Sequence, residues 1–506
     1  MSHGANNGVN HSGALYSVAQ VRALDEHAIS VLGVPGYALM SRAADAALQL
    51  LRKRWPQARR LTILTGSGNN GGDGLVLARL ARAAGLDVTV LAMAEAGQLR
   101  GDARRAADDL IAAGGQLLPF AAAGGDLRRL PTSEVIVDAL LGTGLRTAVR
   151  ADYASAIEAI NASGRPVLAL DLPSGLDGDS GAVHGAAVRA NCTITFVANK
   201  TGLYLGEGPE HAGAIALDGL QVMAPEHAAS QPVFDLLSDA DVARALPPRT
   251  RDAHKGNFGR VLIIGSGTGM PGAVRLAGES CLRSGAGLVM TATAPENVAP
   301  IAEARPELIC IAAHSAADIR TQLASATVVA VGPGLGLDAW GRGLFNAAIA
   351  SGKPLIIDAD ALTLLAEAGG HAPEGSILTP HPGEAARLLG VANATIQHDR
   401  RAALQALVAK SHATVVLKGA GTLIGAPGKV PALCASGNPG MAAPGMGDVL
   451  TGLIAGIRAQ CADPWLAARA GVQAHASAGD ALAKRSGARA LLALELAAEL
   501  PHWLNA

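Results

Sequence analysis

The feature that most constrains the fold is a regular alternation of short apolar runs with amphipathic segments. After a helical pattern from Ser17 to Trp55, the first half of the chain carries five such runs: LTILTG (61–66), DVTVLAM (87–93), VIVDALLG (135–142), PVLALDLPSG (166–175) and CTITFVAN (192–199). Segments with helical spacing, such as LVLARLARAAG (75–85), lie between them. Continuous apolar runs are typical of parallel strands covered on both faces, and helices supply the crossovers. This predicts an α/β domain of three layers with a parallel sheet in the middle.

The same alternation starts afresh in the second half. Its apolar runs are RVLIIGSG (260–267), LVMTAT (288–293), TVVAVGPG (327–334), PLIIDAD (354–360) and TVVLKG (414–419). Strand signals fade after about Leu220, and Pro, Ser and Asp punctuate the stretch up to Pro247–Pro248. A second, independent α/β domain is therefore expected. The predicted boundaries are a flexible lead (1–14), a first domain (15–227), a linker (228–240) and a second domain (241–506).

Composition narrows the classes of function. Aromatic residues make up only 3% of the chain, so the core has to be built from Ala, Val, Leu and Ile. Basic and acidic residues number 41 and 42, which gives no electrostatic support for binding nucleic acid. The sequence has no run of ~18 uninterrupted apolar residues, which a membrane span would need. Its start, MSHGANNGVNHSGALYS, lacks the basic and apolar regions of a secretory signal. We expect a cytoplasmic homo-oligomer that acts on small molecules and binds neither nucleic acid nor membranes.

The first polar motif is GSGNNGGDG (66–74), between a predicted strand and a predicted helix. Its glycines let backbone amides approach a ligand, and the amino end of a helix favours an anion. The spacing matches GxGxxG, so a dinucleotide oxidoreductase and a ligand-free glycine turn are both alternatives. Asn69, Asn70 and Asp73 argue against both, because a plain pyrophosphate cradle avoids negative charge. A dinucleotide site also has an acidic residue ~20 residues after the glycine-rich loop, at the end of the next strand. Here only Glu95 lies near that position.

Further polar residues follow predicted strands. Asp138 lies in VDALLGTGL, and Asp171 and Ser174 lie in DLPSGLDGDSG. Because the carboxyl ends of parallel strands share one edge of a sheet, these loops are expected to converge with Asn70. Asn70, Asp138 and Ser174 then offer hard oxygen ligands to a cation, and Asp171 is placed to exchange a proton with a substrate. The competing interpretation makes each Asp a cap or turn residue. Lys200, at a fourth strand end, is either a catalytic lysine or a solvated one.

In this order, GxGNNGGDG, VDALLGTGL and DLPSGLDGDSG resemble the epimerase domain of the NAD(P)H-hydrate repair enzymes, over roughly residues 15–225. The resemblance implies a Rossmann-like domain in which Asn70, Asp138 and Ser174 hold potassium and Asp171 contacts the substrate. It also implies that two loops hold the hydrated nicotinamide, through Asn69, Asn70, Gly71, Gly72, Asp73, Gly142, Thr143, Gly144, Leu145, Arg146, Thr147 and Ala148. The sequence departs from the family pattern at LMSRAA (39–44), where an acid and a glycine are usual.

The strongest motif of the second half is NPGMAAPGMGDVLTGLIAG (438–456). Gly445 and Gly447, just before a predicted helix, are expected to form an anion hole in which backbone amides face phosphoryl oxygens. Asp448 beside that hole is placed to take a proton from a hydroxyl while phosphate is transferred to it. A plain helix N-cap is a compatible interpretation of Asp448. KGAGT (418–422) follows a strand and offers a lysine and backbone amides to nucleotide phosphates, although it lacks the spacing of a Walker A loop.

A rigid prolyl turn, TPHPGE (379–384), carries His381 and Glu384 after a strand, and a purely structural turn is the competing interpretation. With HKGNFG (254–259), GSGTGMPGA (265–273), GPGLG (332–336) and DADAL (358–362), these strings resemble the ribokinase-like fold, and within it the nucleotide-dependent NAD(P)H-hydrate dehydratases, over residues 240 to 500. The resemblance implies a nucleotide site at Lys418, Gly419, Ala420, Gly421, Thr422 and Gly447. It implies contacts to the hydrate from Ala273, Gly336, His381 and Asp448.

The two halves resemble consecutive steps of one repair route, and we predict a bifunctional NAD(P)H-hydrate repair enzyme. The first domain would interconvert the R and S epimers at C6 of the hydrated nicotinamide ring, with K⁺. The second would phosphorylate the C6 hydroxyl of the S epimer from ADP or ATP with Mg²⁺, and loss of phosphate would restore NADH or NADPH. The predicted catalytic residues are Asp171, Lys200 and Asp448.

One alternative is a ribokinase-like small-molecule kinase fused to a Rossmann-like binding domain, which would accumulate a phosphorylated product. Another is a non-catalytic nucleotide-sensing module, which would bind without turnover.

Overall fold

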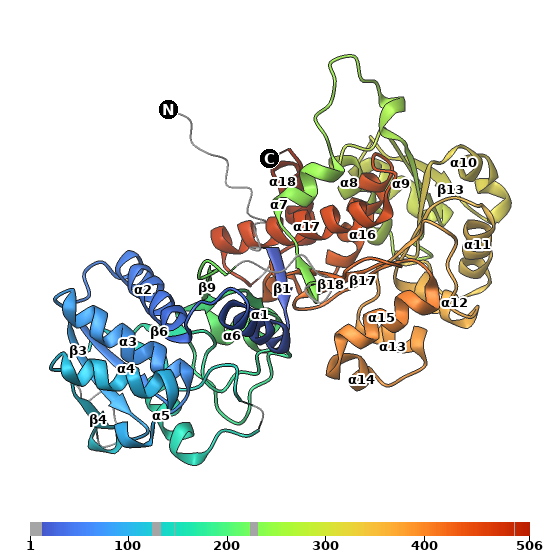
Figure 1. The fold of residues 1–506 in the computed structure, drawn as a ribbon. Coiled ribbons are helices and arrows are strands. Elements are labelled where there is room, and N and C mark those ends of the chain that lie inside the picture. The colour runs from blue at the N-terminus through green and yellow to red at the C-terminus, as the bar shows by residue number, and fades with distance from the viewer. Residues whose placement is uncertain (1–12, 124–132, 146, 223–230, 490, 506) are drawn as a thin grey trace. The chain divides into compact units, whose positions relative to one another are not determined.

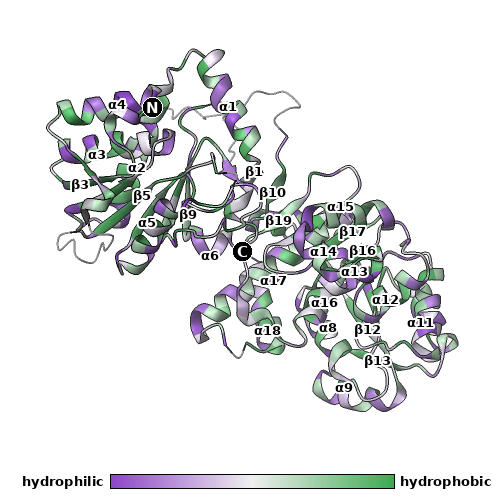
Figure 2. Ribbon diagram, turned by 90° about the horizontal axis from the view of Figure 1, so that it is seen from below, coloured by the Kyte–Doolittle hydropathy of each residue, from purple (hydrophilic) through white to green (hydrophobic). Residues whose placement is uncertain are grey.

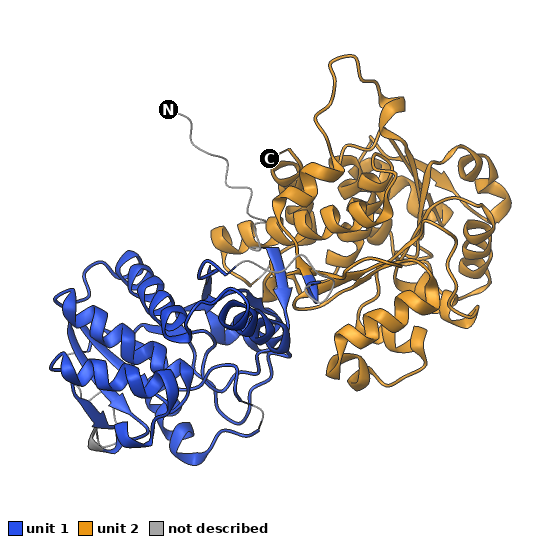
Figure 3. Ribbon diagram, viewed as in Figure 1, with its two compact units in different colours: residues 1–234 blue, residues 235–506 orange. Residues whose placement is uncertain are grey.

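The computed structural model describes residues 13–123, 133–145, 147–222, 231–489 and 491–505. The chain forms two compact units, Met1–Phe234 and Asp235–Ala506 (Figure 3). The predicted lead falls almost wholly outside the described residues, and the predicted linker is described from residue 231 onward. That part of the linker contains strand β10 (Phe234–Leu236) and the start of helix α7 (Asp239–Ala245). In the ranges given above, none of the helices combines the length and the apolar character needed to cross a bilayer.

The first unit is built on a parallel sheet (Figure 1). Its strands are β1 (Ala14–Tyr16), β2 (Arg60–Thr65), β3 (Asp87–Ala92), β4 (Leu117–Pro119), β5 (Val135–Ala139), β6 (Val167–Leu170), β7 (Cys192–Phe196), β8 (Asn199–Lys200) and β9 (Ala214–Asp218). The sheet order is β4-β3-β2-β5-β6-β7-β9, with every neighbour parallel, while β1 pairs with β8. The chain order reverses between β2 and β5, and such switch points are where α/β sheets bind ligands, beyond the carboxyl ends of the strands.

The helices of the first unit connect these strands. They are α1 (Val18–Ser30), α2 (Gly36–Arg54), α3 (Asn69–Ala83), α4 (Gly101–Ala112), α5 (Ala151–Ala162) and α6 (Gly208–Ala212). The helical pattern from Ser17 to Trp55 folds as two helices, because Gly33, with a φ of +67°, and Pro35 interrupt it. Ser17 starts the first helix with a capping box, so its hydroxyl satisfies an otherwise unpaired backbone amide.

Alternate strand residues of the first unit are buried on opposite faces of the sheet, as three layers require. Leu61 and Ile63 pack in a cluster with side chains of α1, α2, α3 and α4, whereas Leu64 packs in another cluster with side chains of α5. Figure 2 shows hydrophobic residues along β3 and β5, between these helices. The predicted three-layer domain is confirmed.

The second unit contains a larger mixed sheet. Its strands are β10, β11 (Arg260–Ile264), β12 (Leu288–Thr293), β13 (Ile309–Ala312), β14 (Val328–Val331), β15 (Leu355–Ile357), β16 (Ile377–Leu378), β17 (Thr414–Leu417), β18 (Thr422–Gly425) and β19 (Ala432–Cys434). They follow the order β13-β12-β11-β14-β15-β16-β17-β18-β19-β10. Strand β18 runs antiparallel to both of its neighbours, and the other pairs are parallel. The apolar runs of the sequence predicted β11, β12, β14, β15 and β17 and missed the short strands β10, β13, β16, β18 and β19.

Helices cover this second sheet. They are α7, α8 (Gly272–Arg283), α9 (Val298–Ala304), α10 (Arg320–Ser325), α11 (Ala339–Ala350), α12 (Ala359–Glu367), α13 (Pro382–Leu389), α14 (Asn393–His398), α15 (Arg400–Ser411), α16 (Met446–Arg458), α17 (Pro464–Ser486) and α18 (Ala493–Leu504). Val261 and Ile263 of β11 pack in one cluster with side chains of α8, α16 and α17. The intervening Leu262 is fully buried outside that cluster. The second α/β domain is therefore confirmed as well.

Candidate active sites

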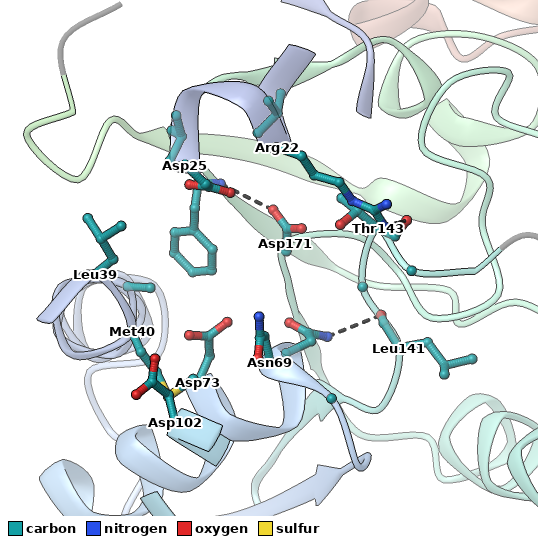
Figure 4. A pocket seen from close by; sticks show the side chains of 18 of the residues that line it. Arg22, Asp25, Leu39, Met40, Asn69, Asp73, Asp102, Leu141, Thr143 and Asp171 are labelled. Atoms are coloured by element: carbon teal, nitrogen blue, oxygen red, sulfur yellow. Dashed lines mark hydrogen bonds between the residues drawn. The ribbon is translucent and has the colours of Figure 1, made fainter. Parts of the chain in front are cut away.

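A cavity of about 710 Å³ lies beyond the carboxyl ends of β2, β5 and β6 (Figure 4). Its walls come from the glycine loop after β2, the start of α3, the loop after β5, the end of β6 and the helix α1. The loops after β2 and β5 approach each other so closely that a Cβ on Gly66 would lie 1.9 Å from the Leu140 carbonyl oxygen. Glycine is needed there for the two backbones to meet.

The glycine loop is also packed against itself, and this supports a first prediction. A Cβ on Gly71 would lie 2.1 Å from the Gly66 carbonyl oxygen, so Gly71→Ala forces the loop to move. We expect this variant to lower the free energy of unfolding by ~1–3 kcal/mol. Gly68→Ala is the matched control, because nothing lies within 4 Å of the added methyl group and the φ of Gly68 is −97°. Chemical denaturation checks both variants, and equal destabilisation would contradict the packing.

The residues predicted to hold a cation come together around Leu141. Asp138 is fully buried and accepts hydrogen bonds from the Ser174 hydroxyl at 2.6 Å and from the Ser174 backbone amide at 2.8 Å. The Asn70 side-chain amide donates to the Leu141 carbonyl oxygen at 3.1 Å, while Asn70 Oδ1 is buried without a hydrogen-bond partner among the described residues. Burial raises the pKa of Asp138 to about 6, although the bonds from Ser174 oppose the shift. An orphaned amide oxygen, a hydroxyl and one carboxylate fit a monovalent cation such as potassium.

Asp171 and Lys200 form an ion pair on another wall of the cavity. Lys200 is only 1% exposed, and its ammonium group donates to Asp171, to the Thr195 hydroxyl at 3.0 Å and to the Phe196 carbonyl oxygen at 2.8 Å. All three of its donors are used, so the interpretation of Lys200 as a solvated lysine is wrong. Asp171 takes a φ of +65°, a conformation that is uncommon for a residue with a Cβ and is often found at functional sites.

Most of the residues predicted to hold the substrate line this cavity: Asn69, Asn70, Asp73, Gly142, Thr143, Gly144, Leu145 and Thr147. Gly71, Gly72 and Ala148 are not among its lining residues. Gly72 instead faces Met40 of α2, at 2.5 Å from an added Cβ, so its role is in helix packing. Arg146 lies outside the described residues.

Sequence reasoning missed what α1 and α4 contribute to this cavity. Arg22 and Asp25 of α1 line it, and the Arg22 guanidinium donates to the Thr143 carbonyl oxygen at 2.7 Å. Asp102 of α4 is a further lining residue. No glycine-rich motif marks these positions. The only signal in the sequence is an acid directly after the buried Leu24, and only the folded chain brings it to the sheet edge.

In the second unit, the predicted residues gather at the amino end of α16. Gly445 takes a φ of +85° just before the helix, and Asp448 lies in its first turn. A Cβ on Gly447 would lie 3.5 Å from Lys418 Nζ, so the ammonium group is next to the start of the helix. Burial raises the pKa of Asp448 to about 7, with a further increase from Asp358 and an opposing effect of Lys418. A carboxyl group that titrates near neutral pH is suited to accept a proton during catalysis.

Lys418 is held by a buried carboxylate from the DADAL motif. Its Nζ donates to Asp358 Oδ1 at 2.8 Å, and the Thr451 hydroxyl donates to Asp358 Oδ2 at 2.7 Å. Glu384 Oε2 lies 3.9 Å from the same Nζ. Although burial opposes it, the negative charges of Asp358 and Glu384 raise the pKa of Lys418. The lysine therefore stays charged at neutral pH, as a phosphate-binding lysine must. The sequence singled out DADAL without assigning Asp358 this role.

His381 has a structural role in its turn, because it caps the helix that follows. Its Nδ1 accepts a hydrogen bond from the Gly383 backbone amide at 3.0 Å, and its backbone amide donates to Glu384 Oε2 at 2.8 Å, which together cap α13. Its Nε2 lies 3.3 Å from Glu384 Oε1. Burial and the charge of Lys418 lower the pKa of His381, so the ring is neutral at physiological pH. The side chain is 55% exposed, which leaves it accessible to a ligand.

The remaining predicted residues lie on neighbouring loops. Ala273 lies in the first turn of α8 and packs on the GPGLG loop, where a Cβ on Gly334 would lie 3.2 Å from the Ala273 Cβ. In the same loop the Gly336 backbone amide donates to Asp360 Oδ2 of the DADAL motif at 2.8 Å. The loop is therefore tied to the motif that carries Asp358.

The KGAGT loop is held by Arg400, which sequence reasoning missed. The Arg400 guanidinium donates to the carbonyl oxygens of Leu417 at 3.1 Å and Lys418 at 3.3 Å, and also to that of Ala420. Because these bonds occupy the loop's carbonyl oxygens, they fix its backbone between β17 and β18. Nothing in the local sequence around Arg400 marks it as a loop partner.

Two family models match the chain, one in each unit. Residues 36–202 match the family described as YjeF-related protein N-terminus, and residues 261–502 match the family described as NAD(P)H-hydrate dehydratase. A solved structure of a ribokinase-like superfamily protein from Enterococcus faecalis is 33% identical, with a TM-score of 0.51, and covers 54% of this chain and 96% of that one. The ribokinase-like fold predicted for the second unit is thereby confirmed.

Relatives extend over nearly the whole chain. The bifunctional NAD(P)H-hydrate repair enzyme Nnr of Coxiella burnetii is 46% identical over 488 residues, covering 96% of this chain and 98% of that protein. The enzyme of the same name from Escherichia coli is 41% identical over 485 residues, covering 96% and 93%. These matches favour the repair-enzyme prediction over the kinase and sensing-module alternatives. The chain therefore belongs to the family of bifunctional NAD(P)H-hydrate repair enzymes.

Proposed function

We propose that this protein, a cytoplasmic homo-oligomer, repairs hydrated NADH and NADPH in two steps, one in each unit. The first unit interconverts the R and S epimers at C6 of the hydrated nicotinamide ring. The second unit dehydrates the S epimer with ADP or ATP. The observation that carries the proposal is Asp448, whose pKa of about 7 suits a proton acceptor, beside Lys418 at the amino end of α16.

In the first unit, the hydrated ring enters the cavity between α1 and α3, and the loops at Asn69–Asp73 and 142–148 hold it. Asn70, Asp138 and Ser174 would hold a potassium ion, which would supply a fixed positive charge at this end of the cavity when bound. The ion pair of Asp171 with Lys200 presents the second carboxylate oxygen of Asp171 to the substrate. The unpaired Asn70 Oδ1 supports the potassium site, because a buried amide oxygen without a partner is costly.

In the second unit, Asp448 takes the proton of the C6 hydroxyl while that oxygen attacks the terminal phosphoryl group of ADP or ATP. Lys418 and the backbone amides at the start of α16 bind the phosphoryl oxygens, and Gly419–Thr422 hold the nucleotide. Mg²⁺ bound with the nucleotide would neutralise charge on the phosphate oxygens. Phosphate then leaves C6, the ring nitrogen donates its electron pair, and loss of the C5 proton restores the reduced nicotinamide. Ala273, Gly336 and His381 contact the hydrate.

Separated epimers of the hydrate test the two steps. With nucleotide and Mg²⁺, we expect both epimers to give NADH, inorganic phosphate and spent nucleotide. Without nucleotide, we expect the epimers to interconvert and no NADH to form. A stable phosphorylated hydrate would instead support a kinase, and nucleotide binding without any turnover would support a sensing module.

The cation site supports a further prediction. We expect that replacing potassium by a bulky organic cation slows epimer interconversion, because three oxygen ligands around Leu141 lose the ion that balances Asp138. Dehydration of the S epimer at constant Mg²⁺ is the internal control, because it takes place in the other unit. Epimer ratios followed by chromatography give the rates. An unchanged interconversion rate would contradict the assignment of Asn70, Asp138 and Ser174 to the ion.

A further inference from the structure

Four carboxyl groups from different elements line the cavity of the first unit: Asp25 from α1, Asp73 from α3, Asp102 from α4 and Asp171 after β6. Figure 4 shows Asp25 and Asp73 on opposite sides of the open space and Asp171 on a third side. The other titratable or charged residues that line the cavity are Arg22, Tyr153 and Lys200. Acidic side chains therefore outnumber basic ones in this cavity, and a bound dinucleotide adds more negative charge. This excess of negative charge favours a proton on one of the carboxyl groups.

Asp171 is poorly suited to carry that proton. One of its oxygens accepts from the buried Lys200 ammonium group, and the Phe196 backbone amide at 3.4 Å and the Thr195 hydroxyl at 3.5 Å face the same oxygen. Protonation of Asp171 would leave the ammonium group of Lys200 buried without a counter-charge, which is strongly unfavourable. Asp171 therefore neutralises Lys200 and anchors substrate, and the proton has to be held by another group.

Asp25 and Asp73 are free to exchange protons. No side chain or backbone amide of the described residues donates a hydrogen bond to either carboxyl group, and neither forms an ion pair there. Burial raises the pKa of Asp25 to about 6, with Lys200 opposing the shift. Burial raises the pKa of Asp73 well above its usual range, and the charges of Asp171 and Asp25 raise it further. Both carboxyl groups therefore hold a proton more readily than an exposed aspartate does, and they can donate or accept one at the two sides of the cavity.

We propose that Asp25 is a catalytic residue of the epimerisation, acting with Asp73 as an acid–base pair that serves the two faces of the hydrated ring. The inference rests on the epimerase function proposed above. In the route that we infer, the hydroxyl group leaves C6 from one face and water returns on the other. Two free carboxyl groups on opposite walls of one cavity supply a proton donor for the first event and a proton acceptor for the second.

The reaction balances without any further reagent. Asp73 donates its proton to the C6 hydroxyl, the C6–O bond breaks, and the electron pair of the ring nitrogen forms a double bond to C6 as water departs. A water molecule then adds to the opposite face, the electrons of the double bond return to nitrogen, and Asp25 takes the released proton. The product is the other epimer. The same steps run backwards for the reverse direction, and exchange with solvent resets the pair.

Asp25→Asn in the full-length protein tests the proposal, with Glu26→Gln as the matched control, because Glu26 is the exposed neighbour on the same helix. We expect Asp25→Asn to slow catalysed epimerisation by ~10²-fold or more and Glu26→Gln to leave it unchanged. Rates are measured from pH 5.5 to 8 by chromatography of the epimers, and the enzyme-free rate is subtracted. Dehydration of the S epimer reports on the second unit, and thermal unfolding reports on folding.

The pH profile separates a catalytic role of Asp25 from a structural one. The wild-type rate should fall as the pH decreases through about 6, because a protonated Asp25 cannot accept a proton. That decrease should be absent in Asp25→Asn, and Asp25→Glu should restore it. In water labelled with oxygen-18, each inversion should place one labelled oxygen at C6. Unlabelled product, or an Asp25→Asn enzyme with the wild-type rate and profile, would overturn the proposal. A wild-type enzyme that interconverts no epimers would instead overturn the epimerase function itself.

Discussion

We expect Asp448→Asn to lower nucleotide-dependent dehydration of the S epimer by ~10²–10⁴-fold. Asparagine keeps the size of the side chain and much of its capping capacity at the start of α16, but it cannot accept the proton of the C6 hydroxyl. Epimerisation, which takes place in the other unit, should be unaffected. Asp463→Asn is the matched control, because Asp463 caps the neighbouring helix α17 through the Trp465 backbone amide and is not part of the proposed site.

The pH dependence gives a second test of Asp448. Since the base has to be ionised, the wild-type dehydration rate should fall as the pH decreases through about 7. Asp448→Asn should lose that dependence, whereas a variant that is merely destabilised would keep it. Dehydration within a few-fold of the wild-type rate in Asp448→Asn would rule out the proposed phosphoryl-transfer mechanism.

We expect Asp171→Asn to abolish catalysed epimerisation and to destabilise the first unit. The variant leaves the ammonium group of Lys200 buried with only the Thr195 hydroxyl and the Phe196 carbonyl oxygen as partners. Breaking a buried ion pair by removing one partner costs about 3–5 kcal/mol. With an epimer mixture, the S form should be repaired quickly and the R form only as fast as it epimerises spontaneously. Progress curves should therefore show two phases.

A double variant separates stability from chemistry at this ion pair. Lys200→Met combined with Asp171→Asn removes both charges, so the double variant should recover much of the lost stability without recovering epimerisation. The control is Asp152→Asn, because Asp152 is an exposed residue in the first turn of α5 and forms no ion pair with Lys200. If Asp171→Asn retained both its thermal stability and a single-phase progress curve, the ion pair would have neither the structural nor the catalytic role given to it.

The local elements and several site residues are readable along the chain. Apolar runs such as LTILTG and RVLIIGSG carry their own burial pattern, so they predicted β2 and β11 at nearly their observed positions. The glycine-rich strings at the ends of such strands predicted that Asn70, Asp138 and Ser174 meet, because the parallel topology alone brings strand ends to one edge. The structure places Asp138 within β5 and Asn70 in the first turn of α3. The alternation of strand and helix patterns was also enough to predict two α/β units. The hydrophobic pattern of each strand or helix is visible within its own short stretch of sequence.

The partners of these residues depend on contacts between distant segments. Nothing near Lys200 indicated that its ammonium group is buried against Asp171, and nothing near Lys418 indicated that Asp358 and Arg400 hold it and its loop. Asp25 reads as one more polar residue on an amphipathic helix until α1 is packed over the cavity. Burial and neighbouring charge set the pKa values of Asp25 and Asp448, and both arise only when the chain is folded. The sequence thus carries the residue types of each site, whereas their ionisation and pairing follow from the tertiary packing that removes water from around them.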